Sequence, residues 1–242
     1  MLIQLKIRRR WLLICFGLFL LTFVFFGQQW ITSTMNPLPK PIEQIETDNN
    51  VIALTINVDW GDEFIPGILS ELKKANAKVT FFVTGRWAKE HPDLLKAMAA
   101  DGHEIENHGY SHPHPDNISV TANQEEIRKT ESIIQEIIGI KTNLYAPPYG
   151  EKGASGLKAA EQLGYKTILW TLDTVDWRTD STPEVIAQRI LNPKQRFGIM
   201  PKKQGAIVLM HPKANTLKAL PVILQQLIKE NFQMLPLREL IT

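Results

Sequence analysis

The sequence predicts an α/β domain built on a parallel β-sheet, arranged either as a (β/α) barrel or as a doubly wound sheet. Two observations predict this class. From residue 51 onward, short apolar runs of strand length alternate with amphipathic stretches of helical period. Clusters of polar residues also follow successive strands, as they do at the active-site edge of parallel α/β folds.

The alternation continues through the whole domain and gives about seven strands with roughly six or seven helices. The strand candidates are rich in Val, Ile, Leu and Phe, and one helix candidate ends at a glycine, Gly102. We expect strands at 51–58, 78–83, 103–107, 143–146, 165–170, 205–210 and 232–235, and helices at 64–76, 91–102, 123–139, 155–164, 182–191 and 217–230.

The N-terminus carries an export signal. Lys6 and three consecutive arginines, Arg8–Arg10, precede an apolar run from Trp11 to Phe26. The positive-inside rule keeps such a basic tip in the cytoplasm and places the rest of the chain outside. We favour an uncleaved anchor because residues 27–36 offer no good small-x-small cleavage site, and a cleavable signal peptide is the alternative. The expected location is the cell membrane, crossed once, with the C-terminal domain extracellular.

Three parts follow from this pattern. Residues 1–31 are the cytoplasmic tip and membrane anchor, and residues 32–50 are a linker with prolines at 37, 39 and 41. Residues 51–242 form the domain. A hydrophobic fraction of 44% and a charged fraction of 21% are typical of a globular protein, and a net charge of +2 gives no reason to expect a nucleic-acid partner. Cys15 is the single cysteine, which excludes an intramolecular disulfide and a Cys-ligated zinc site.

The polar clusters contain a candidate metal site. His108 and His112 follow the third strand with three residues between them, a spacing that allows two imidazoles to meet one ion. Asp59 follows the first strand and His211 the sixth, so the parallel sheet brings them to the same edge. Two imidazoles with one carboxylate form a common catalytic metal set. Zinc is the leading candidate, with cobalt or nickel possible, and the alternative is a pair of surface histidines.

Several motifs in order resemble the polysaccharide deacetylases, the NodB-homology domains of carbohydrate esterase family four. The stretch NHGYSHP resembles the family's His-(Ser/Thr)-x-x-His motif, with Gly109 in place of the hydroxyl residue. KVTFFVTG resembles the family's second strand, DTVDW its Asp-x-x-Asp-Trp motif, and LMH its Leu-x-His. The resemblance covers residues 51–242 and implies a distorted parallel barrel of about seven strands. It is strongest to membrane-anchored, sporulation-associated deacetylases of Gram-positive bacteria.

The resemblance implies a role for each candidate residue. His211 would be the general acid, and Asp176 would fix its tautomer and raise its pKa. We rank Asp59 first as the third metal ligand beside His108 and His112, with a displaced base and a loop carboxylate as alternatives. The residues expected to form apolar walls around a sugar ring and an acetyl methyl group are Tyr149, Trp177 and Leu209.

Two departures from the family pattern concern one catalytic element. The family usually has Thr-Phe-Asp-Asp-Gly after the first strand, whereas this chain has Asn57 at the position of the general base. An amide cannot accept a proton from water at neutral pH. The family's Arg-Pro-Pro-Tyr, whose arginine orients that base, reads Ala146-Pro147-Pro148-Tyr149 here. The two changes fit together, because an arginine without its acidic partner would be an unpaired buried charge.

The expected function is metal-dependent removal of N-acetyl (or O-acetyl) groups from a cell-wall polysaccharide such as peptidoglycan or a chitin-like glycan, with reduced activity. Such an enzyme is a hydrolase of carbon–nitrogen bonds other than peptide bonds. The alternative is a glycan-binding protein of the cell surface with impaired catalysis. A structural membrane protein with this fold is a third interpretation, but it leaves the ordered polar motifs unexplained.

Overall fold

The computed structural model describes residues 37–195, 198 and 200–241. Residues Pro39–Thr242 form one compact unit. The predicted membrane anchor, residues 1–31, lies outside the described residues, as does the first part of the predicted linker. Within the part of the chain that the structure describes, no helix is long and apolar enough to cross a membrane.

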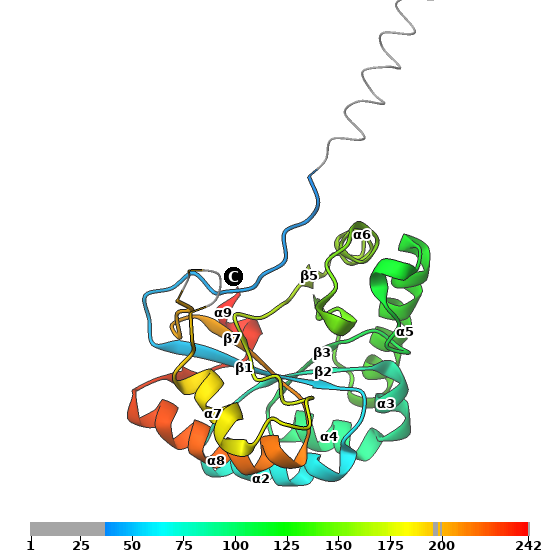
Figure 1. Cartoon of the computed structure of the whole chain (residues 1–242). Coiled ribbons are helices and arrows are strands. Elements are labelled where there is room, and N and C mark those ends of the chain that lie inside the picture. The colour runs from blue at the N-terminus through cyan, green and yellow to red at the C-terminus, as the bar shows by residue number, and fades with distance from the viewer. Residues whose placement is uncertain (1–36, 196–197, 199, 242) are drawn as a thin grey trace, which may run out of the picture. The chain divides into compact units, whose positions relative to one another are not determined.

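The sheet is parallel and follows the strand order β5-β4-β3-β2-β1-β7-β6, with β8 also pairing with β1 (Figure 1). This arrangement, with helices outside it, confirms the distorted parallel barrel. The stretch 165–170, predicted as one strand, contains the shorter β5, and β6 was not predicted. The strands are β1 (Val51–Val58), β2 (Thr80–Val83), β3 (Glu104–Asn107), β4 (Leu144–Tyr145), β5 (Lys166–Thr167), β6 (Leu172–Asp173), β7 (Ala206–Met210) and β8 (Gln233–Met234).

The helices follow the strands along the chain, and α2, α4, α7 and α8 lie along one side of the sheet in Figure 1. Hydroxyl side chains cap three of them: Thr84, Ser119 and Thr182 each accept a hydrogen bond from a backbone N–H of the first turn. The prediction missed α3 and α9, which are short. The helices are α2 (Ile65–Lys74), α3 (Gly85–Glu90), α4 (Pro92–Ala100), α5 (Val120–Ile138), α6 (Ala154–Gln162), α7 (Pro183–Leu191), α8 (Ala214–Lys229) and α9 (Leu237–Leu240).

The segment before β1 lies along the open side of the barrel. The backbone N–H of Ile42 donates to the carbonyl of Thr167, and that of Ile45 donates to the carbonyl of Gly205. Thr167 belongs to β5, one end of the strand order, whereas Gly205 directly precedes β7 near the other end. Residues 42–45 therefore connect the two sides of the barrel at the place where the strands do not close it.

Strand alternation divides the side chains between two environments. The even residues of β1, from Ile52 to Val58, belong to the large apolar core shared with the helices. Its odd residues face the barrel interior, where Ala53 joins a smaller apolar cluster with Phe82 and Ala146. Asn57 is therefore an interior residue near the carboxyl end of the central strand.

A second polar group lies in the barrel at its amino-terminal end. Glu104 and Glu106 of β3 both contact the guanidinium of Arg238, which comes from α9. The side chain of Glu106 is fully buried, and burial raises its pKa to about 7 although Arg238 and the N–H groups of Asn143 and Leu144 donate hydrogen bonds to it. This end of the barrel is therefore sensitive to pH.

Glu106→Gln tests this pH sensitivity. The pKa of Glu106 in the folded protein lies above its ordinary value of 4.5, so the folded state binds the proton more tightly than the unfolded state does. This proton binding stabilises the parent fully below pH 4.5, and the stabilisation is lost as the pH rises to about 7. The amide does not titrate, so the free energy of unfolding of the variant relative to the parent should rise by up to about 3 kcal/mol across this range. Urea denaturation of parent and variant at several pH values measures this difference in the free energy of unfolding. Glu161→Gln, on the exposed face of α6, is the control, and a difference independent of pH would contradict the account.

Candidate active site

A cavity of about 450 Å³ opens at the carboxyl edge of the sheet. Strands β1 and β7 and the loops after the parallel strands supply its walls, as the parallel topology requires. Eight of the nine site residues predicted from the sequence line it, and Asp176 lies directly behind His211. The lining residues are Asn57, Asp59, Trp60, His108, His112, Tyr149, Gly150, Trp170, Asp173, Trp177, Leu209 and His211.

His211 is held by a buried carboxylate. Its Nδ1 lies 2.7 Å from Oδ1 of Asp176, and its backbone N–H donates to Oδ2 at 2.7 Å. The hydroxyl of Thr216 donates to the same Oδ2 at 2.7 Å. The carboxylate accepts from Nδ1–H and so fixes the tautomer, which leaves Nε2 as the nitrogen free for chemistry. The indole of Trp60 stacks on the imidazole with ring centroids 5.7 Å apart, which restricts the tilt of the ring.

The two motif histidines lie against each other, with ring centroids 4.9 Å apart. Nδ1 of His108 lies 2.7 Å from the backbone carbonyl oxygen of Ala146. A carbonyl can only accept, so Nδ1 carries the proton and Nε2 keeps its lone pair. Burial and, to a smaller extent, proximity to His112 lower the pKa of His108 to about 3. Burial also lowers the pKa of His112, and the charges of His211 and Arg86 act in the same direction.

Asp59 forms an ion pair that the sequence did not predict. Both of its carboxylate oxygens lie 2.9 Å from one terminal nitrogen of Arg86, and its Oδ1 also accepts from the Thr84 hydroxyl at 2.8 Å. Arg86 and Thr84 come from the junction of β2 and α3. Since α3 itself was not predicted, no signal in the sequence placed a guanidinium beside this carboxylate.

Asn57 and Ala146 are both buried, and both face the barrel interior. The side-chain oxygen of Asn57 has no hydrogen-bond partner among the residues that the structure describes. Ala146 contributes its methyl group to the interior apolar cluster, against which Trp170 also packs. Neither side chain carries a charge, so Asn57 cannot act as a carboxylate base and Ala146 cannot orient one.

Aromatic side chains form the walls of the cavity. Tyr149 and Trp177 are 56% and 54% exposed, so their rings are available to a ligand. Tyr149 contacts the ring of His112 and stacks on His114, whose Nδ1 pairs with Glu151. Trp170, which the sequence did not single out, lies so close to Gly150 that a Cβ there would come within 2.3 Å of it. The glycine in PPYG is thus required for this wall.

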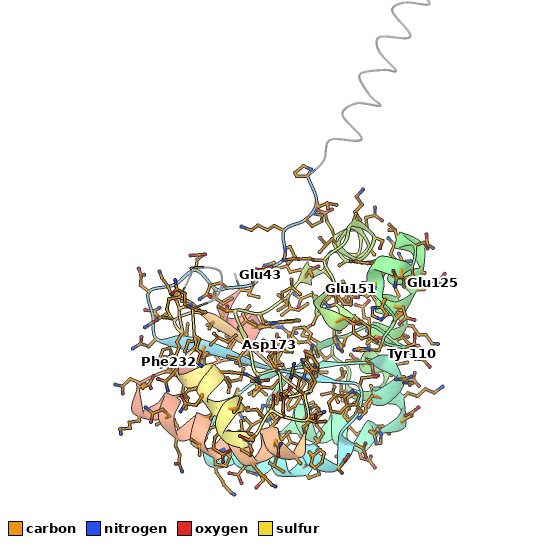
Figure 2. All side chains as sticks on the ribbon, in the orientation of Figure 1. Glu43, Tyr110, Glu125, Glu151, Asp173 and Phe232 are labelled. Carbon is orange, nitrogen blue, oxygen red and sulfur yellow. The ribbon has the colours of Figure 1, made fainter. Side chains whose placement is uncertain are left out.

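The side chain of Asp173 stabilises the turn at the start of the loop that carries Asp176 and Trp177. Its Oδ1 accepts from the backbone N–H of Val175 at 2.7 Å, and Val175 has a φ of 49°. A β-branched residue with positive φ is strained, and the Asp173 side chain holds that turn in place. Figure 2 shows Asp173 near the middle of the molecule, between Phe232 on one side and Glu151 and Tyr110 on the other. Asp173 also lines the cavity as a second carboxylate that the prediction omitted.

The donor chemistry fits a divalent transition metal at the histidine pair. Both imidazoles are neutral near pH 7, and the hydrogen bond from His108 to the Ala146 carbonyl is the kind of support that ligating histidines have. The predicted third ligand, Asp59, is turned to Arg86 instead. Within residues 37–195, 198 and 200–241, no group of three or more His, Cys, Asp or Glu side chains is arranged to hold a metal ion.

Comparison with known proteins agrees with this geometry. The sequence model of the family described as polysaccharide deacetylase matches residues 44–168. The chain belongs to the polysaccharide deacetylase family. It is 36% identical to the uncharacterized protein YlxY of Bacillus subtilis, over 78% of this chain and 56% of that protein. It is 35% identical to a peptidoglycan-N-acetylglucosamine deacetylase of Bacillus cereus, over 66% of this chain and 55% of that enzyme. The chain thus spans little more than half the length of these two relatives.

Among solved structures of polysaccharide deacetylases, BA3943 of Bacillus anthracis is similar, with a TM-score of 0.77 and 34% identity over 84% of this chain and 69% of that one. It is described as a pseudoenzyme of carbohydrate esterase family four. A mutant of BA3943 described as having restored enzymatic activity matches equally well, with a TM-score of 0.77 and 33% identity over 84% of this chain and 72% of the mutant chain.

Replacing Asn57 by leucine tests whether this amide stabilises the fold. Because its oxygen has no partner, Asn57→Leu should leave the free energy of unfolding unchanged or raise it by about 1 kcal/mol. Asn107 is the matched control, since its amide donates to Ile127 and its oxygen accepts from Gly109, so Asn107→Leu should cost about 2 kcal/mol or more. Equal losses in urea denaturation would mean that Asn57 has a stabilising partner.

Proposed function

We propose that the domain binds an N-acetylated (or O-acetylated) sugar of a cell-wall polysaccharide in the cavity and removes the acetyl group with low turnover. The observation that carries this proposal is the pair His211–Asp176, which shares one aromatic-walled cavity with His108 and His112. The similarity to a peptidoglycan-N-acetylglucosamine deacetylase supports peptidoglycan as the polymer.

The residues of the chain supply part of a hydrolytic mechanism. Water attacks the acetyl carbon, the carbon–nitrogen bond breaks, and the departing amine must gain a proton. His211 in its protonated form can donate that proton from Nε2 while Asp176 stabilises the imidazolium. Exposed Trp177 and Tyr149 can pack against the sugar ring, and Leu209 offers an apolar surface to the acetyl methyl group.

A divalent ion, zinc first among the candidates, would be held by His108 and His112 with Asp59 as the third ligand. When bound, it would supply Lewis-acid polarisation of the acetyl carbonyl and acidify water. The proton lost by the attacking water still needs an acceptor. Asn57 cannot take it, and Asp59 is paired with Arg86, so this proton transfer is the weak step.

A second candidate function follows from the same defect. The domain would bind acetylated glycan without turnover, as a pseudoenzyme. Asn57 with its unpartnered oxygen and Ala146 in an apolar cluster favour this alternative, and so does the similarity to a pseudoenzyme of the same family. The restored activity of the BA3943 mutant supports the view that mutation can return catalysis to a pseudoenzyme of this family.

The proposal extends to location and domain organisation. Residues 1–31 would anchor the chain in the cell membrane, residues 32–50 would act as linker, and the domain from residue 51 would face the cell wall. A role in sporulation rests on the sequence resemblance alone. These statements concern a segment that lies largely outside the described residues, and they derive from the basic and apolar pattern of the N-terminus.

The double variant Asn57→Asp/Ala146→Arg tests the proposed function. Asn57→Asp alone buries a carboxylate without a cation, so it should help little. Adding the arginine should supply the partner, and the double variant should release acetate faster than the parent by more than the two single changes combined. A general base contributes about 10²–10⁴-fold, so even partial recovery should be measurable with peptidoglycan or chitin oligomers and added metal.

The control for this experiment is Asn57→Asp/Ala146→Gln, which has the same new carboxylate and a long polar side chain without charge. Thermal melting verifies folding, since the new side chain at 146 enters the cluster against which Trp170 packs. Slow acetate release by the parent identifies an enzyme, whereas release by the double variant alone identifies a pseudoenzyme. A folded double variant without any gain would show that Asn57 is not at the base position and would make Asp59 the leading base.

A further inference from the structure

The ion pair between Arg86 and Asp59 engages the carboxylate that the proposed metal site needs. One guanidinium nitrogen donates to both carboxylate oxygens at 2.9 Å, and the Thr84 hydroxyl adds a third hydrogen bond at 2.8 Å. A carboxylate offers about four lone-pair sites to donors or metals. Most of the binding capacity of Asp59 is therefore already in use within the chain.

Arg86 is held in this position by the backbone around it. Its own N–H donates to the carbonyl of Tyr110, and the N–H of Gly85 donates to the carbonyl of Gly109. These two bonds tie the start of α3 to the loop between His108 and His112. A Cβ at Gly85 would come within 2.7 Å of Thr130, so α3 starts in close packing with α5. The backbone of Arg86 is thus tied to the same loop as the histidine pair, while its side chain remains able to move.

A metal ion and a guanidinium cannot share Asp59 freely. Both are cations that bind the same oxygen lone pairs. Each therefore weakens the binding of the other to Asp59, by charge repulsion and by occupying the lone pairs. The side chain of Asp59 is only 13% exposed, whereas that of Arg86 is 46% exposed. The arginine can therefore turn into solvent when an ion arrives, while Asp59 stays in the wall of the cavity.

We infer that Arg86 is an intramolecular competitor for the divalent metal at Asp59 and sets the metal affinity of this site. The inference rests on the proposed function only in assuming that His108, His112 and Asp59 are the ligand set. Arg86 is a positioning residue: it acts through Asp59 and has no place in the chemical step.

The test is a metal titration of the full-length chain in detergent, with Zn²⁺ followed by calorimetry and Co²⁺ by its absorption spectrum. Arg86→Gln should bind both ions about 5-fold more tightly than the parent, because the ion no longer has to displace the guanidinium from Asp59 and a partly exposed ion pair is worth up to about 1 kcal/mol. Asp59→Asn/Arg86→Gln should show no gain over Asp59→Asn. His108→Ala/His112→Ala should lose the ion in either background.

Arg178→Gln is the matched control for the loss of one positive charge. Arg178 makes a similar two-contact pair, with Asp180 rather than Asp59, and lines a neighbouring cavity that also includes Trp60. The metal affinity of the Arg178→Gln variant should equal that of the parent. If Arg86→Gln melts at a much lower temperature, Arg86→Lys replaces it, because a lysine keeps the charge but lacks the planar fork, and its gain should be smaller.

Unchanged or weaker metal affinity in Arg86→Gln would overturn the inference and would instead identify Arg86 as a support for Asp59. A gain that persists without Asp59, or that Arg178→Gln reproduces, would also overturn it, since the effect would then be general electrostatics. If neither the parent nor Arg86→Gln binds the metal, then His108, His112 and Asp59 do not form a metal site. Acetate release is measured separately, so tighter metal binding without deacetylation refutes the enzyme while leaving the role of Arg86 intact.

Discussion

The parallel register of the strands is the constraint on which the rest of the structure depends. Because β1, β2, β3 and β7 run in one direction with matched registers, the residues at their carboxyl ends share one edge. Alternation then sends every second side chain of these strands into the barrel. His108 and His211, about a hundred residues apart in sequence, reach one cavity by this route. A shift of one residue in β1 would move Asn57 into the apolar core and Ile56 into the cavity.

The same geometry explains how the proposed active site would differ from that of an intact deacetylase. The residues proposed as the acid side are held firmly: Asp176 contacts His211 twice, and Thr216 supports the carboxylate. The base side has become apolar or neutral through Ala146 and Asn57. The absence of both the carboxylate and the arginine leaves no unpaired charge buried, so the fold tolerates it. Under the proposed function, the site would keep the means to recognise an acetylated sugar and to protonate a leaving group, while the removal of a proton from water would be impaired.

The sequence predicted the sheet, most helices and the residues around the cavity, because these depend on local periodicity and on the rule for parallel strand ends. It did not predict β6 or α3, which are too short for a periodic signal. Arg86 was missed together with α3, since its contact with Asp59 depends on tertiary packing. Trp170 and the carbonyl of Ala146 were missed because their roles come from close approach and from the backbone. The assignment of each site residue to a step remains a prediction from the resemblance.

Tryptophan fluorescence can measure whether the cavity recognises an acetyl group, because Trp60, Trp170 and Trp177 line it. The full-length chain would be titrated with an N-acetylglucosamine oligomer and with the matching glucosamine oligomer. We expect saturable binding of the acetylated oligomer, weakened in Trp177→Ala, and much weaker binding of the free amine. Equal affinity for the two oligomers, or an affinity unaffected by Trp177→Ala, would contradict the claim that this cavity recognises acetylated glycan.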